Sequence, residues 1–367
     1  MQFQQKTLSD LPNLLCLAAF LFVLTSFSLM GCSGSDGDGS VDTGGSQTAN
    51  DLLDGSYRLY LFADGTGDGW NQLNATNFDG AGGFSSTTVY DSDGDSTTFS
   101  GTYTVGIDGM LTIEDTDISG QTSADGSFFA TTDTNPSDAD GDISLGVTLK
   151  SGSGLDNTVL NGTYTVCQIR KDVSGTMSSR MRITFDGAGV LNGDILEDSD
   201  GSTGSLTGTY TVASNGELGM VVTDLSKDFI GNVSADGNII LILDTDDDGE
   251  ILMMVGVKAA SGMDVADFSG DFQINLYNCD ISETFTSRID LSADGAGALS
   301  VDILAASDGD LSEQPDMVYT VASDGTLTIT GTDNIGQLSS DGEVFVLVDA
   351  DASSDGEVAL LIGIKKS

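Results

Sequence analysis

The sequence predicts an all-β protein of three tandem units, each with eight antiparallel strands that follow one another as a meander. First, a pattern of Gly, Asp and Tyr residues occurs three times, at a spacing of about 107 residues. Second, short runs rich in Val, Ile, Leu, Thr and Tyr are separated by Asp-Gly or Asn-Gly pairs. Third, no useful length of chain after Met30 has the 3.6-residue period of a helix.

Composition excludes several classes of function. The 367 residues include 57 acidic and 12 basic side chains and no histidine, which gives a formal net charge of −45. Without histidine there is no Ser-His-Asp triad, no Cys-His pair and no imidazole metal site. The negative charge repels phosphate backbones, so we expect no nucleic-acid partner. The apolar content of 39% is too high for a wholly disordered chain.

Residues 1–31 are predicted to be a signal peptide. A polar start is followed by the apolar run Leu14–Met30. The sequence Leu29-Met30-Gly31-Cys32 resembles the lipobox of bacterial lipoproteins. This resemblance implies cleavage before Cys32, diacylation of its sulfur and, with Ser33 next, a place in the outer membrane. The alternative is an uncleaved anchor, although 17 residues are marginal for a span. Residues 32–53 are predicted to be a flexible linker.

The three repeats are assigned to residues 54–154, 155–262 and 263–367. A Gly-x-aromatic triplet opens each unit, and an Asp-Gly-Ala-Gly sequence begins 24 residues after its glycine. The glycines are Gly55, Gly162 and Gly270, and the aspartates are Asp79, Asp186 and Asp294. A Tyr-Thr-Val sequence follows at Tyr103, Tyr210 and Tyr319.

The strands are easiest to predict from the sequence of the third unit. The predicted ranges are 268–278, 284–292, 297–304, 316–322, 325–331, 334–339, 343–349 and 357–366. Asp-Gly pairs join strands two to three, four to five and six to seven, where tight hairpins need a positive φ. Because successive turns of a meander alternate between two ends, these tight turns share one end and the longer connections share the other.

One tight end and one open end are typical of a small barrel, which eight strands suffice to close. The main alternative is a six-bladed propeller with two blades per unit, since Gly-x-Tyr also opens strand four at Gly101 and Gly208. Open sandwiches are a further alternative. The strands are short for a transmembrane barrel, which needs about 9–11 residues per strand.

A Gly-x-aromatic triplet that opens an eight-stranded meander is similar to the lipocalin and avidin group. Tyr57, Tyr164 and Phe272 stand where that group usually has tryptophan. Lys150, Lys258 and Lys365 in the last strands are the candidates for a basic partner of these rings. The resemblance implies a small apolar ligand inside the barrel.

The acidic connections are the candidate metal sites. Aspartates occur at alternate positions, and carboxylates spaced in this way can converge on Ca²⁺, which takes six to eight oxygen ligands. The candidate residues are Asp91, Asp93, Asp95, Asp138, Asp140, Asp142, Asp244, Asp246 and Asp248. The alternative interpretation is that these turns are simply solvated and keep the protein soluble.

Two cysteines remain beyond the signal peptide and Cys32. They are Cys167 and Cys279, which do not occupy equivalent positions in their units. The cell envelope is oxidising, so a disulfide between them is one hypothesis. The other is that both are thiols, which pack as small apolar side chains.

Two late strands, 239–243 and 344–348, lack alternation and are apolar on both faces, and so is much of 251–257. A strand buried on both faces needs a second layer. We therefore expect these strands to pack between units or against a partner.

Taken together, these features predict a non-catalytic, lipid-anchored protein of the cell envelope, with a surface, structural or binding role and acidic loops that bind Ca²⁺ or stay hydrated. One alternative is a lipocalin-like carrier of a small apolar ligand, and a protein partner is also compatible. A hydrolase that uses loop carboxylates is the least favoured alternative, because no unit's acids stand out from the others.

Overall fold

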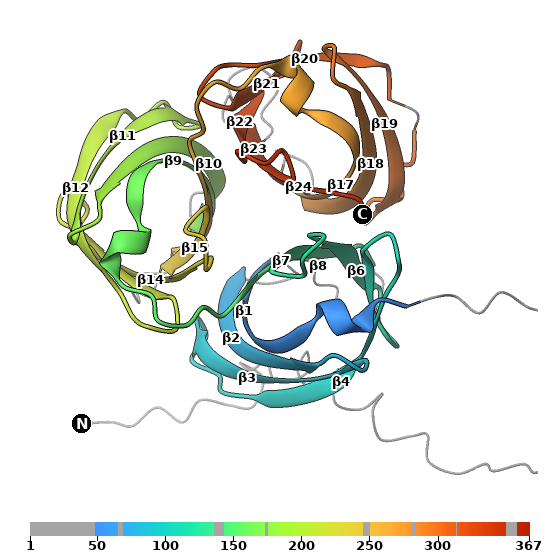
Figure 1. The fold of residues 1–367 in the computed structure, drawn as a ribbon, viewed down its shortest axis with the longest axis horizontal. Coiled ribbons are helices and arrows are strands. Elements are labelled where there is room, and N and C mark those ends of the chain that lie inside the picture. The colour runs from blue at the N-terminus through green and yellow to red at the C-terminus, as the bar shows by residue number, and fades with distance from the viewer. Residues whose placement is uncertain are drawn as a thin grey trace, which may run out of the picture.

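The computed structural model of the chain describes residues 48–64, 69–135, 143–172, 175–244, 250–279, 284–312, 314–349 and 358–367. In these ranges the strands form three closed barrels of eight strands each, which Figure 1 shows end-on. Within each barrel the strands follow chain order, and the first strand pairs with the eighth. The predicted eight-stranded units are confirmed. The propeller alternative is wrong, because each set of eight strands closes on itself.

Barrel 1 begins with a short 3-10 helix. It comprises η3 (Asn50–Leu52), β1 (Asp54–Asp64), β2 (Trp70–Asp79), β3 (Gly83–Asp91), β4 (Thr98–Val105), β5 (Met110–Ile113), β6 (Ile118–Thr122), β7 (Phe128–Asp133) and β8 (Ile143–Lys150).

Barrel 2 repeats this order. It comprises η4 (Asn157–Val159), β9 (Asn161–Asp172), β10 (Gly175–Asp186), β11 (Val190–Asp198), β12 (Gly204–Val212), β13 (Glu217–Val222), β14 (Lys227–Val233), β15 (Ile239–Asp244) and β16 (Ile251–Lys258).

Barrel 3 comprises η5 (Val265–Asp267), β17 (Ser269–Cys279), β18 (Thr284–Asp294), β19 (Ala298–Ala306), β20 (Met317–Val321), β21 (Thr326–Thr330), β22 (Asn334–Leu338), β23 (Val344–Asp349) and β24 (Val358–Lys365). Each strand predicted for this unit lies within two residues of the observed one at both ends. None of the helices in the described ranges is long and apolar enough to cross a bilayer.

The tight end of each barrel is closed by its 3-10 helix. A buried tyrosine of the fourth strand donates its hydroxyl hydrogen bond to the backbone carbonyl just after that helix. These bonds are Tyr103 to Leu53 at 2.8 Å, Tyr210 to Leu160 at 2.9 Å and Tyr319 to Phe268 at 2.6 Å. Because a buried hydroxyl needs a partner, this bond fixes the helix over the end of the barrel.

The lysines of the last strands lie over the opening aromatic rings. Their ammonium groups are 5.6, 5.8 and 6.0 Å from the ring centroids in the pairs Lys150–Tyr57, Lys258–Tyr164 and Lys365–Phe272. These distances are those of cation–π contacts. The predicted basic partners of the rings are therefore these three lysines.

The last residues of the range predicted to be a linker contact the tight end of barrel 1. Leu53 is fully buried in the barrel, and the amide of Ala49 donates to the carbonyl of Val105 at 2.7 Å. Thr48 forms an isolated bridge with Gly106. Residues 48–53 belong to barrel 1, because they close its tight end.

A single apolar core joins the three barrels. Apart from Leu73 of β2, its buried members lie on the outward faces of the first, seventh and eighth strands of the barrels. Leu241, Val255, Val346 and Leu360 are fully buried there. This confirms that the strands apolar on both faces pack between units. Burial of each such side chain contributes about 1.5–3 kcal/mol, so this core is a large part of the folding free energy.

The hydrogen bonds between barrels follow a cyclic order. A polar side chain sixteen residues after each unit glycine donates to a backbone carbonyl of the next barrel around the ring. These bonds are Asn71 to Leu252, Ser178 to Asp349 and Thr286 to Asp133. They join barrel 1 to 2, 2 to 3 and 3 to 1, which is the pattern of a closed ring with head-to-tail interfaces.

All three barrels point in the same direction. The bonds just named lie near the open ends on both sides of each interface. Other contacts join the tight end of one barrel to the tight end of the next. They are Arg58 with Glu217, Arg182 with Asp324, and the Ser367 amide with the Asp108 carbonyl. The open ends therefore lie on one face of the molecule and the closed ends, with their 3-10 helices, on the other (Figure 1).

The disulfide hypothesis is wrong for this structure, in which Cys167 and Cys279 are both thiols. Cys167 is buried in the core between the barrels, and its thiol lies 3.9 Å from the carbonyl of Val346. Cys279 ends β17 and accepts a hydrogen bond from the hydroxyl of Thr284 at 3.4 Å. Burial raises the pKa of the Cys167 thiol to about 12, so this sulfur is an apolar packing group.

The core between the barrels predicts a specific destabilisation. Leu360→Ala removes a fully buried side chain from it and should lower the free energy of unfolding by about 2–4 kcal/mol in urea titrations. Val318→Ala, at a side chain that is 54% exposed on β20, should change it by less than about 0.5 kcal/mol. Equal effects of the two substitutions would contradict this role for the core.

Candidate functional site at the open ends of the barrels

The open-end face gathers most of the acidic connections that the sequence singles out. Because the barrels are parallel, the ends of the third and seventh strands of all three units lie on this face. In barrel 1 the described members are Asp91, which ends β3, and Asp93 and Asp95, which follow it. In barrel 2 the described member is Asp244, at the end of β15.

Asp91 is engaged in organising barrel 1. Its Oδ1 accepts hydrogen bonds from the amides of Asp93 at 2.8 Å and Asp95 at 3.4 Å. Its Oδ2 accepts a hydrogen bond from Gln72 Nε2 at 2.6 Å. The aspartate spacing thus forms a turn stabilised by one carboxylate, which is a common use of aspartate at position one of a turn.

Asp244 belongs to an ion-pair network that the sequence did not reveal. The Asp244 carboxylate is buried and paired with the ammonium of Lys227, which also contacts Glu250 at 2.8 Å. Arg170 lies 3.5 Å from the same Glu250 and 3.3 Å from Asp200. Buried charges of one sign need such partners, so these two basic residues hold the acidic end of barrel 2 together.

Asp198 has an unusual protonation behaviour within this network. Burial raises the pKa of its carboxyl to about 6, although Asp200 donates a backbone hydrogen bond to it at 3.0 Å. Arg170 is 4.0 Å away, which is too far to offset the desolvation. Asp198 is therefore a titrating group on the open-end face between pH 4 and 7.

The remaining predicted site residues lie outside the described ranges. They are Cys32, Asp138, Asp140, Asp142, Asp246 and Asp248. Among the residues that are described, no group of three carboxylates or cysteines is arranged to hold a metal ion. Calcium binding therefore stays a prediction.

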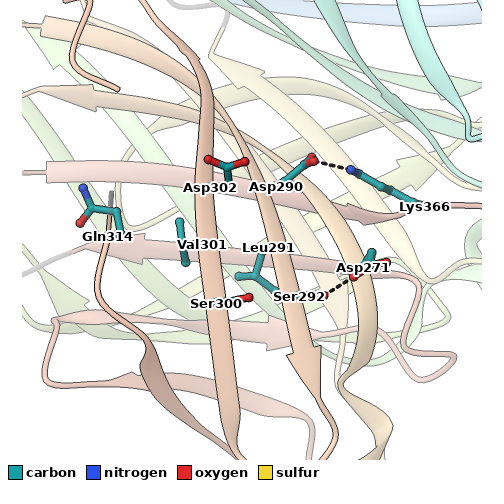
Figure 2. Close-up of a pocket in the computed structure, with 9 residues that line it drawn as sticks. All are labelled: Asp271, Asp290, Leu291, Ser292, Ser300, Val301, Asp302, Gln314 and Lys366. Atoms are coloured by element: carbon teal, nitrogen blue, oxygen red, sulfur yellow. Dashed lines mark hydrogen bonds and ion pairs between the residues drawn. The ribbon is translucent and has the colours of Figure 1, made fainter. Parts of the chain in front are cut away.

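Two hollows lie on the outer walls of barrels 2 and 3. The one on barrel 3 has a volume of about 510 Å³ and is lined by Asp271, Asp290, Asp302 and Lys366, among others. Figure 2 shows Lys366 bonded to Asp290, at 2.6 Å, while Ser292 bonds to Asp271. A hollow of about 230 Å³ on barrel 2 has Arg182 and Asp194 in place of Asp290 and Asp302.

These hollows occupy equivalent places. Asp290 faces Asp302 across β18 and β19, as Arg182 faces Asp194 across β10 and β11. The opposite charges on barrel 2 and the like charges on barrel 3 show that the two walls do not share one binding chemistry. The repeated feature with common charge is instead the open-end face.

The network around Lys227 predicts a strong effect of removing one partner. Lys227→Met leaves the Asp244 carboxylate buried without its ammonium and should lower the free energy of unfolding by about 2–4 kcal/mol at pH 7. The double variant Lys227→Met with Asp244→Leu should recover most of this loss. Lys258→Met, a lysine at the tight end, is the control and should cost less than about 1 kcal/mol in the same urea titration. A double variant no more stable than the single one would contradict the pairing.

The raised pKa of Asp198 predicts a pH dependence of stability. Between its ordinary value near 4 and its folded value of about 6, the folded chain binds more protons than the unfolded chain. Stability contributed by this group therefore falls as pH rises from about 4 to 6. Asp198→Asn should flatten that slope and raise stability at pH 7 by about 1–2 kcal/mol, measured by thermal unfolding across this range. An unchanged slope would contradict the assignment.

Comparisons with known proteins find only distant likeness. No family model matches the chain, and no curated protein matches it. Among solved structures, a mutant of transferrin binding protein B from Haemophilus parasuis is 10% identical, with a TM-score of 0.31, over 85% of this chain and 76% of that one. The isotype 1 protein of that name from serogroup B Neisseria meningitidis is 9% identical, with a TM-score of 0.30 and the same coverage. A protein of unknown function from Nostoc punctiforme, of the DUF3598 family, is 9% identical, with a TM-score of 0.23, over 58% of this chain and 99% of that one.

Proposed function

We propose that the protein is a lipid-anchored, non-catalytic binding module of the bacterial outer membrane that presents its acidic open-end face to a cationic partner. The observation that carries this proposal is the parallel packing of the three barrels. It puts the open ends of all units on one face, where the acidic loops act as one multivalent surface.

The place where the chain enters supports an outward orientation for this face. Thr48 and Ala49 pair with residues at the tight end of barrel 1, on the side opposite the open-end face. A chain anchored through Cys32 would therefore reach the barrels from their tight ends. The acidic face would then point away from the membrane, where a soluble or surface partner can approach it.

The interiors of barrels 2 and 3 favour binding at the rim over carriage of a small apolar ligand. Barrel 2 is filled by buried apolar side chains such as Met181, Ile183 and Met254. Barrel 3 is filled in the same way, with Phe268, Phe272 and Phe345 packed ring against ring. Close-packed interiors of this kind leave no room for a ligand.

The partner that fits this face is a basic segment of a protein, with Ca²⁺ as the second candidate. A basic segment gains from many weak carboxylate contacts and needs no preformed coordination sphere. Calcium needs six to eight oxygens around one point. Aspartates at alternate positions could supply these oxygens, and this spacing is the observation that favours Ca²⁺ as the second candidate.

The test compares two variants of the chain from Ser33 onward that lose the same charge at opposite ends. The open-end variant carries Asp93→Asn, Asp95→Asn, Asp308→Asn and Asp310→Asn, and the tight-end variant carries Asp51→Asn, Asp54→Asn, Asp108→Asn and Asp267→Asn. With a ten-residue lysine peptide in calorimetry, the open-end variant should lose at least fivefold in affinity and the tight-end variant less than twofold. Equal losses would mean that net charge alone drives binding, and would contradict the proposal.

A second arm of the same test uses Ca²⁺. The calcium candidate predicts a rise in melting temperature that exceeds that with Na⁺ at matched ionic strength, and the open-end variant should lose part of it. Equal shifts with the two ions would exclude specific calcium binding while leaving the peptide result to decide the first candidate.

A further inference from the structure

One layer of side chains inside barrel 1 differs in kind from the same layer in the other two barrels. Cross-strand pairing places five inward residues of barrel 1 side by side around the wall: Asn74, Leu59, Thr148, Phe129 and Thr122. The same pairs in barrel 2 are Met181, Val166, Gly256, Ile240 and Val233. In barrel 3 they are Ile289, Ile274, Gly363, Phe345 and Leu338.

Three polar side chains in the barrel 1 layer have unused hydrogen-bonding capacity. Asn74, Thr122 and Thr148 are each fully buried. Asn74 Oδ1 and the hydroxyls of both threonines have no hydrogen-bond partner among the described residues. Buried polar atoms are almost always satisfied, so three unpaired ones in one layer make it a place where a bound group would gain hydrogen bonds.

The carboxylate of Asp91 determines the orientation of the Gln72 and Asn74 amides, and therefore which kind of group Asn74 Oδ1 can bind. A carboxylate only accepts hydrogen bonds, so Gln72 must turn its amide nitrogen toward Asp91, at 2.6 Å. The carbonyl of Gln72 then accepts from Asn74 Nδ2 at 2.7 Å. This chain leaves Asn74 Oδ1 as an acceptor that faces the interior, and the bound group must supply an N–H or O–H donor.

Two apolar side chains inside barrel 1, one in this layer and one above it, keep exposed surface. Leu59 and Leu61 point inward, because both lie within 3.5 Å of the position that a Cβ atom at Gly146 would occupy. Both side chains nevertheless remain partly exposed. Their equivalents are buried: Val166 and Gln168 in barrel 2, and Ile274 and Leu276 in barrel 3. Leu61 is one layer nearer to the open end than Leu59.

We propose that the open half of barrel 1 binds a small neutral or cationic molecule that donates an N–H or O–H hydrogen bond to Asn74 Oδ1 and places an apolar part against Leu59 and Leu61. Thr122 and Thr148 supply further hydrogen bonds to the same molecule. The carboxylates around the open end, Asp91 among them, disfavour an anion. This site is independent of the rim chemistry proposed above, since its residues lie inside one barrel.

The first measurement tests whether small molecules reach the site. In a Cys279→Ser background, Leu61→Cys and the equivalent Leu276→Cys of barrel 3 are treated with aminoethyl and sulfonatoethyl methanethiosulfonate, which are cationic and anionic thiol reagents. The Leu61→Cys variant should react with the cationic reagent at least tenfold faster than Leu276→Cys does, and faster than with the anionic one. Equal rates for the two positions would overturn the proposal.

The second measurement tests the hydrogen-bonding layer with tyramine, which has an amine, a hydroxyl and an apolar ring. The wild-type chain should bind it saturably in calorimetry, and 4-hydroxyphenylacetate, its anionic analogue, at least tenfold more weakly. The triple variant Asn74→Met, Thr122→Val and Thr148→Gly, which copies barrel 2, should lose at least tenfold in affinity. The control variant Thr87→Val, on the exposed outer face of β3, should bind tyramine as tightly as the wild type does.

The melting temperature of the triple variant separates loss of the site from loss of the fold. A folded triple variant that binds tyramine as well as the wild type does, or a wild type without saturable tyramine binding, would overturn the proposal. The lysine-peptide result at the rim bears on neither outcome, so failure of one proposal is distinguishable from failure of the other.

Discussion

The apolar core between the barrels is the contact on which the rest of the structure depends. A single eight-stranded barrel can bury one face of each strand in its own interior. Here the first, seventh and eighth strands of each unit bury their second face as well, against the other two units. Because these faces are apolar in all three units, no barrel can leave the ring without exposing them to water.

This core also determines where function can be located. A closed head-to-tail ring aligns the barrel axes, so every tight end is on one face and every open end on the other. The tight ends are occupied by their 3-10 helices, each tied down by a buried tyrosine. The open ends carry the acidic loops and the titrating Asp198. Three similar units thereby present their three open ends together on one face, which no single unit can do.

The similarity of the units makes their differences informative. The wall of each barrel is built from the same turns and the same strand pairs, yet the inward layer at Asn74 is polar only in barrel 1. Exchange of three side chains at equivalent places in the register changes the chemistry of an interior without disturbing its wall. A tandem protein can therefore keep two barrels as scaffold while the third acquires a different role.

Much of the fold could be predicted from the sequence because its signals are local. The Asp-Gly pairs mark tight turns, and the strands around Ile239 and Val344 lack alternation, which already indicated packing between units. The pair of Lys227 with Asp244 could not be predicted, since it depends on the register of β14 against β15 and on the burial of the residue that ends β15. The polar layer in barrel 1 could not be predicted either, because its five residues lie on five strands whose registers must all be known. The sequence left open whether Cys167 forms a disulfide or is a thiol, because disulfide formation depends on the distance between two cysteines in space. In the structure β9 packs between the barrels, and Cys167 is a buried thiol there.

The central claim is that the three barrels form one cooperative unit through their shared core, and native-state hydrogen exchange tests it most directly. The amides of β7, β8, β15, β16, β23 and β24 should show the same high protection, equal to the global free energy of unfolding, and should lose it together as urea is added. Exchange of one barrel's strands at a separate and much lower free energy would contradict the claim, because it would mean that this barrel opens while the others stay folded.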